Sequence, residues 1–144
     1  MKTRQRGTAI VEFALILPLL LLLTMITTEF GRAIYQYNTI VKSLRNATRY
    51  LSLQTPNTKI TEAKNLVVFG NIAGTGPFLV PGLTVAQVST IPPTWLTTGS
   101  NPVINTVKIT VTGYTFHSMF TTVFGVTFGD ITYGDISATM RSSS

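Results

Sequence analysis

The sequence predicts an α+β protein in which a long membrane-spanning helix continues into a small soluble head with a short helix and an antiparallel sheet. Three observations support this fold class. Residues 10–28 form an apolar run whose only charged residue is Glu12. Amphipathic helical spacing continues from there to about Leu51. Alternating apolar and polar residues, separated by Gly and Pro, then indicate short strands towards the C-terminus.

Composition excludes several classes of function. The chain of 144 residues has no cysteine and a single histidine, His117, so it cannot assemble the usual zinc or haem sites alone. Its net charge is +6, but Lys2, Arg4 and Arg6 precede the apolar run and the other cations are dispersed. This placement favours a cytoplasmic N-terminus in a membrane protein over nucleic-acid binding. We expect no metal, no cofactor and no small-molecule substrate.

The apolar run is long enough to cross a lipid bilayer. Residues 10–28 would rise about 28 Å as a helix, close to the thickness of a hydrocarbon core. Twelve Leu, Ile, Val and Phe residues between 10 and 26 favour insertion by about 4–7 kcal/mol, more than the roughly 2.5–3.5 kcal/mol that a carboxylate costs. Insertion therefore tolerates Glu12. A cleavable secretory signal fits less well, because no small-x-small site follows the run.

Pro18 lies in the middle of the run and cannot donate a hydrogen bond to the carbonyl of Ala14. We expect a helix kink or local loosening there. The predicted organisation is a cytoplasmic leader over residues 1–7, a transmembrane helix over 8–30, its continuation over 31–53, and an α+β head over 54–144.

The beginning of the run resembles a known processing signal. Gly7 directly precedes Thr8, and Glu12 is the fifth residue counted from Thr8, as at the cleavage site of type IV prepilins and pseudopilins. The string over residues 7–21, with Glu12-Phe13-Ala14 followed by an apolar run that carries Pro18, resembles the TadE-like proteins of tight-adherence (Flp-type) pilus systems.

This resemblance implies a minor pilin or pseudopilin, a structural or assembly component of a pilus or related secretion filament, and not an enzyme. A prepilin peptidase would cut after Gly7 and leave Thr8 as the new N-terminus. The implied partners are that peptidase, other pilin or pseudopilin subunits and the lipid bilayer. The implied location is the bacterial cytoplasmic (inner) membrane, with the N-terminus cytoplasmic and the head extracytoplasmic.

Glu12 has a physical role within this hypothesis. Cleavage would free an amine at Thr8, one helical turn away, in the same chain or in a neighbour. Two unit charges about 4 Å apart attract by roughly 4 kcal/mol at an effective dielectric of 20, so pairing could offset the burial of Glu12. In the uncut chain Glu12 would be solvated near the headgroups. The alternative function is an uncleaved single-span anchor that presents an extracytoplasmic binding domain.

Beyond the membrane, helical spacing predicts one apolar stripe, which is either the core face of the head or a partner surface. The stripe comprises Ile34, Tyr37, Val41, Leu44, Thr48 and Leu51. After a linker over 54–59, a second helix is expected over 61–69, capped by Thr58 or Thr61 and closed by Gly70 or Asn71. The glycines between residues 72 and 82 indicate a surface loop and no phosphate site, because no strand-loop-helix pattern surrounds them.

The remaining sequence predicts strands and an aromatic segment. Strands are expected over 83–89 and 106–112, the latter with Val107, Ile109 and Val111 on one face, joined by an irregular connection in which Trp95 covers the core or makes an exposed contact. Residues 113–129 are aromatic and uncharged, which indicates a core-flanking or membrane-proximal segment or a subunit contact.

The C-terminal region offers no active site to sequence reasoning. His117 is expected to be structural, without a carboxylate partner, and Asp130 and Asp135 flank a strand without a nucleophile or base nearby. The last strand is expected over 131–141, with a bulge at Gly134, and residues 142–144 are expected to fray.

Overall fold

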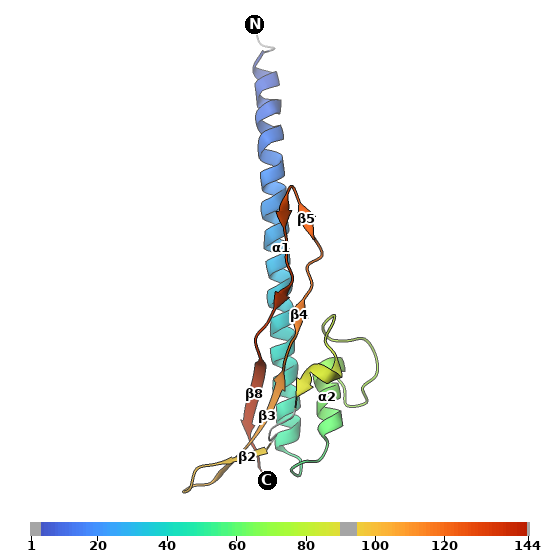
Figure 1. Cartoon of the computed structure of the whole chain (residues 1–144), viewed down its shortest axis with the longest axis vertical. Helices are drawn as coiled ribbons and strands as arrows, with labels where there is room; N and C mark the ends of the chain where they lie inside the picture. The colour runs from blue at the N-terminus through green and yellow to red at the C-terminus, as the bar shows by residue number, and fades with distance from the viewer. Residues whose placement is uncertain (1–3, 90–94, 144) are drawn as a thin grey trace.

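The computed structural model describes residues 4–89 and 95–143, with the backbone alone at residues 4–6. Lys2 of the predicted leader and residues 92–94 of the predicted connection lie outside this part. The observed architecture is a long N-terminal helix with a small α+β head along its C-terminal half (Figure 1). This confirms the predicted fold class. The helices are α1 (Arg4–Ser52) and α2 (Ile60–Phe69), and Val85–Gln87 form a 3-10 turn.

The strands are short except for two. They are β1 (Val88–Ser89), β2 (Trp95–Thr98), β3 (Ile104–Val111), β4 (Thr115–Phe116), β5 (Thr122–Val123), β6 (Val126–Thr127), β7 (Ile131–Thr132) and β8 (Ile136–Arg141).

Helix α1 contains 49 residues and is therefore about 74 Å long at 1.5 Å per residue. It is helical through Pro18, and a kink at that residue stays a prediction. Its N-terminal half extends away from the head, whereas its C-terminal half lies along the sheet (Figure 1).

The central strand of the main sheet is β3. Strands β1 and β2 pair antiparallel with one edge of β3, and β8 pairs antiparallel with the other edge over six residues. The predicted face is confirmed, since Val107, Ile109 and Val111 are buried while Lys108 is exposed. Alternation of this kind directs one face of the strand into the core.

The core lies between α1, α2 and the sheet. Helix α1 contributes a face that differs partly from the predicted stripe. Leu44, Thr48 and Leu51 are buried as expected. Ile34 and Tyr37, however, are 58% and 40% exposed. The other buried residues of this face are Ala33, Gln36, Ile40, Ser43 and Ala47.

The error has a physical reason. Small side chains at Ala33 and Ala47 let the head approach α1 closely, and Gln36 is buried because its Oε1 accepts a 2.7 Å hydrogen bond from the hydroxyl of Tyr114. Tyr37 instead packs at the margin of the core against Tyr133, with 5.6 Å between ring centroids. A prediction from hydrophobicity alone therefore gave the wrong face of α1 at the N-terminal end of the stripe, at Ile34 and Tyr37.

The expected cap of α2 was wrong. The helix is preceded by Lys59 at φ 58°, without a side-chain cap, and Lys59 Nζ lies 2.9 Å from Glu62 Oε1. Thr58 bonds the carbonyl of Thr55 instead. Closure by Gly70 is confirmed: its φ of 75° is in the left-handed region that glycine tolerates, and its N–H bonds Leu66 O.

Other differences lie in the strands. Only β1 forms in the predicted strand over 83–89, because Thr84 and Gln87 cap a 3-10 turn before it. Trp95 begins a strand within the expected irregular connection and packs against the core. The predicted last strand divides into β7 and β8.

Fraying of Ser142 and Ser143 was also wrong. Ser142 N–H donates to Asn105 O at 2.8 Å, and Ser143 N–H donates to Ser52 O at 3.0 Å. These bonds hold the end of the described chain against the last turn of α1.

Candidate functional site

The predicted processing and assembly residues lie on the uncovered part of α1. Every side chain from Gly7 to Leu17 is exposed. Thr8 and Glu12 are four residues apart, so they share one face of the helix, and they line a shallow depression together with Val11 and Leu15. Pro18 is half-buried and lies six residues beyond Glu12, somewhat less than two turns further along. The structure thus places Thr8 and Glu12 on a surface that a neighbouring molecule can reach.

Gly7 is not required by the packing of this chain. A Cβ atom at Gly7 would meet nothing within 4 Å, and the same holds for Gly31 in the same helix. Glycine also costs about 1 kcal/mol relative to alanine inside a helix. Any requirement for glycine at position 7 must therefore come from a molecule outside the chain.

The threonine hydroxyls within the apolar run are hydrogen-bonded inside the helix. The hydroxyls of Thr24, Thr27 and Thr28 donate to the carbonyls of Leu21, Leu23 and Thr24, each at 2.8 Å. Such bonds remove the cost of placing a hydroxyl in lipid. A stretch of 18 residues within this helix has a mean hydropathy of 2.6 and none of it is buried by the head, so α1 is long and apolar enough to cross a membrane.

Glu29 is a site residue that sequence reasoning missed. It is 5% exposed, and its carboxylate lies 2.6 Å from Arg32 Nη1, 3.0 Å from Ser118 Oγ and 3.3 Å from Met119 N. Arg32 also lies over the ring of Phe116, 5.2 Å from its centroid. A buried carboxylate with three donors joins the helix to a distant loop, at the point where the apolar run ends. The spacing of Glu29 and Arg32 could have revealed the local pair, but not the bonds from residues 118 and 119.

His117 has a carboxylate partner, contrary to expectation. Its Nδ1 lies 2.7 Å from Asp130 Oδ2, and Asp130 Oδ1 accepts a bond from the N–H of Ser118 at 3.1 Å. The hydrogen bond from His117, followed by that from Ser118, lowers the pKa of Asp130. Ser118 Oγ is directed to Glu29 rather than to His117, so these side chains do not form a catalytic triad.

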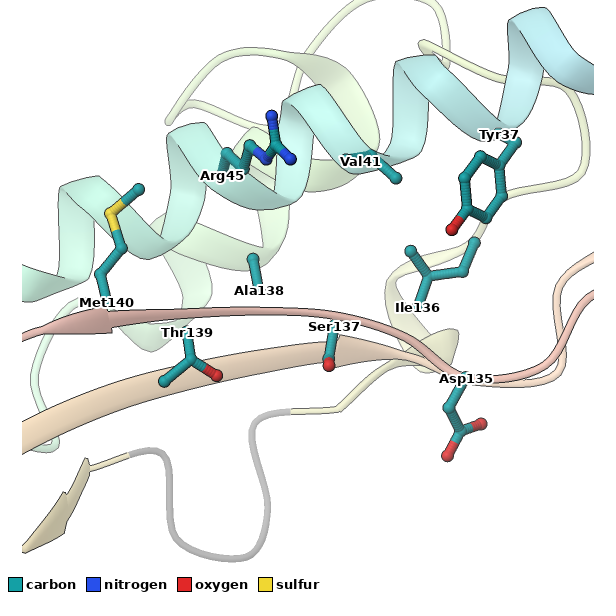
Figure 2. A pocket seen from close by; sticks show the side chains of 9 residues that line it. All are labelled: Tyr37, Val41, Arg45, Asp135, Ile136, Ser137, Ala138, Thr139 and Met140. Atoms are coloured by element: carbon teal, nitrogen blue, oxygen red, sulfur yellow. The ribbon is translucent and has the colours of Figure 1, made fainter. Parts of the chain in front are cut away.

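A groove of about 540 Å³ lies between α1 and β8. Tyr37, Val41 and Arg45 line it from the helix. Figure 2 shows Ile136, Ala138 and Met140 directed towards α1, while the Asp135, Ser137 and Thr139 side chains point away. Within the described residues, the outer edge of β8 has no partner strand. Asp130 and Asp135 are thus separated, one bonded to His117 and the other beside this groove.

The described residues contain no group of three or more His, Asp and Glu side chains that could hold a metal ion. The predicted positions Gly7, Thr8, Glu12 and Pro18 share one helix, whose N-terminal half extends away from the head (Figure 1). The arrangement offers surfaces for lipid and protein contacts.

One comparison with known protein families gives a match on α1. A family model described as "TadE-like protein" matches residues 7–49, which is almost all of α1 beginning at Gly7. The match confirms the resemblance drawn from residues 7–21. It does not extend into the head. Searches of curated proteins and of solved structures gave no match.

Proposed function

We propose that this chain, whose residues 7–49 match the TadE-like family, is a minor pilin or pseudopilin that acts in a tight-adherence pilus or a related secretion filament. The observation that carries the proposal is that the family match falls on a helix whose first half the head leaves uncovered. An uncovered apolar helix needs a second apolar environment. Lipid supplies it before assembly, and the helices of other subunits supply it within a filament.

The orientation follows from charge. Lys2, Arg4 and Arg6 precede the span, and positive residues beside a span stay cytoplasmic. In this arrangement the head is outside the cytoplasm of a bacterium, and the bond between Gly7 and Thr8 is at the cytoplasmic face of the inner membrane. A prepilin peptidase working at that face removes residues 1–7.

Processing changes what Glu12 can do. The new ammonium at Thr8 lies one turn from Glu12 in its own helix, and an exposed Glu12 is equally open to the ammonium of a neighbour. Pairing between neighbours would fix the axial position of one helix against the next. Glu12 is in this proposal an assembly carboxylate, and its burial becomes favourable only when a partner is present.

Processing is tested by replacing Gly7 with leucine and measuring the intact mass of the chain made with its peptidase. Gly7→Leu should stay at full length, while the wild type loses residues 1–7. Gly31→Leu is the matched control, because an added Cβ atom at either glycine of this helix meets nothing within 4 Å. This control should be trimmed like the wild type. Normal trimming of Gly7→Leu would contradict the proposal.

The role of Glu12 is tested by its incorporation into filaments. Glu12→Ala should insert stably in the membrane but incorporate poorly, since the partner ammonium loses its counter-charge. Glu12→Asp keeps the negative charge and should retain part of the wild-type incorporation into filaments. Leu15→Ala removes a side chain one turn away without changing the charge of the helix. Wild-type incorporation of Glu12→Ala would remove the carboxylate from the mechanism.

An uncleaved anchor that presents a binding domain is the second candidate. It is favoured by the groove beside β8, which gives the head a hollow for a binding partner. The two functions differ in the mature chain, because an uncleaved anchor keeps residues 1–7. An intact mass of the protein from its native membrane distinguishes them.

A further inference from the structure

The segment between His117 and Asp130 forms an uncharged hairpin, which we call the apolar hairpin (residues 118–129). It contains β5 and β6, joined by Phe124 and Gly125. Met119 is 69% exposed, Phe124 61% and Val126 40%. Large exposed apolar side chains gathered on one hairpin in this way mark a contact surface.

The apolar hairpin is held against the membrane helix. Ser118 and Met119, at its start, bond Glu29, and a cavity of about 240 Å³ separates Ile26 and Phe30 from Thr127 and Phe128. Figure 1 shows β5 beside α1, on the side of the head that is nearest to the N-terminal half of the helix. Leu22, Met25 and Ile26 are half-buried while Leu21 and Leu23 are exposed, so this face of the apolar run is partly covered.

The depth of the hairpin follows from the charges of α1. No charged residue occurs between Glu12 and Glu29, and these 16 residues rise about 24 Å, somewhat less than the roughly 30 Å of a hydrocarbon core. Glu29 therefore lies near the outer boundary of the lipid tails. Because the hairpin extends from Glu29 towards the N-terminal half of α1, its tip must reach that boundary as well.

The backbone restricts the hairpin to the interface. Its two strands pair over residues 122–127, and Phe128 N–H bonds Thr121 O at 3.0 Å, but a two-stranded hairpin keeps open outer edges. Open edges are not tolerated in the hydrocarbon core and need water or headgroups. Arg32, His117 and Asp130 supply polar groups at its base, on the aqueous side. A hairpin with an apolar tip and a polar base is suited to the boundary between the lipid tails and the headgroups.

We propose that the apolar hairpin is a second membrane contact, in which Met119, Phe124 and Val126 insert into the outer leaflet of the bilayer that α1 spans. Two contacts, the span and the hairpin, fix the rotation and tilt of the head relative to the membrane. The inference rests on the membrane placement of α1 in the proposed function, but not on processing or assembly.

The test uses the absence of cysteine from the natural chain. Single cysteines replace Phe124 at the hairpin tip or Met119 at its start, Leu20 in the span and Ser100 in the loop between β2 and β3. Each full-length variant is labelled with an environment-sensitive fluorophore and placed in phosphatidylcholine vesicles. Quenching is measured with a lipid spin-labelled high on its acyl chain and with iodide in water.

Labels at Phe124→Cys and Met119→Cys should be quenched by the lipid probe several-fold more than the label at Ser100→Cys, and should be protected from iodide. Equal iodide quenching at all three positions would overturn the inference. The inference would also be overturned if the labels were protected from iodide without being quenched by the lipid probe, and if this protection disappeared in nanodiscs that hold one copy each. The hairpin would then contact a second chain. Two positions on the hairpin keep the test decisive if one variant misfolds.

The label at Leu20→Cys separates this inference from the proposed function. If Leu20→Cys is not quenched by a spin label deeper in the lipid, the membrane placement of α1 fails. If Leu20→Cys is quenched and both hairpin labels behave like Ser100→Cys, only the hairpin inference fails.

Discussion

The two halves of α1 have the same backbone and opposite surroundings. From Phe13 to Thr28 the helix carries no charge, and side chains such as Leu15 and Leu19 are 75% and 66% exposed. From Glu29 onwards it is amphipathic, and Ile40 and Leu44 are fully buried. An apolar helix that its own chain leaves uncovered has its partner elsewhere. One continuous helix thus has an exposed apolar half and a half packed against the head, with Glu29 at the change.

The largest difference between the halves should appear in the stability of the head. Leu44→Ala removes a fully buried side chain and should lower the free energy of unfolding by about 2–5 kcal/mol. Leu20→Ala, at a position 49% exposed, should leave the unfolding of the head unchanged. Hydrogen exchange of β3 amides in full-length protein in nanodiscs measures both effects. Equal losses in the two variants would contradict the division of α1.

Substitution of Glu29 tests the boundary between the two halves of α1. Glu29→Gln removes the negative charge to which Arg32, Ser118 and Met119 donate. We expect the free energy of unfolding of the head to fall by about 1–3 kcal/mol, because buried donors are left with a weaker acceptor. Hydrogen exchange should accelerate most at residues 118–121.

Glu12→Gln is the control for this substitution, since it makes the same chemical change on the exposed half of the same helix. Its head should exchange like the wild type. If Glu29→Gln exchanged like Glu12→Gln, the buried carboxylate would not hold the hairpin to α1.

The smallest effect concerns the base of the apolar hairpin. The pKa of Asp130 is lowered in the folded protein, so its contribution to stability is present above the unfolded pKa and is lost as pH falls through the folded pKa. Acidification below the usual range of aspartate should therefore weaken the wild type slightly more than Asp130→Asn.

The measurement is the free energy of unfolding against pH, with Asp135→Asn as a control that removes another exposed negative charge. Both side chains of the His117–Asp130 pair are largely exposed, so solvent screens the pair. Identical pH profiles for the wild type and Asp130→Asn would show that the pair does not affect stability.

Sequence reasoning succeeded where the signal is local. The apolar run, the helix through Leu51, the alternation around Ile109 and closure at Gly70 all follow from spacing or from backbone preference within a few residues. The resemblance over residues 7–21 was also a local signal, and the family match extends it to residue 49.

It failed where distant segments meet. The burial of Gln36 depends on Tyr114, and that of Glu29 depends on Ser118, 89 residues away. His117 was expected to lack a partner because Asp130 is 13 residues away, on the other arm of the apolar hairpin. No periodicity along the chain contains this information, since it arises only when the hairpin folds back. The roles of Gly7 and Glu12 stay predictions, because they concern molecules outside the chain, and the kink at Pro18 also stays a prediction.

The bond between Ser143 and Ser52 has a mechanical consequence. Because β8 lies along α1 and the end of the chain is tied to the last turn of the helix, a pull on the membrane anchor slides the helix parallel to the strands instead of peeling them apart (Figure 1). Loaded in this direction, the bond between Ser143 and Ser52 and the packing of β8 on α1 carry the force in shear.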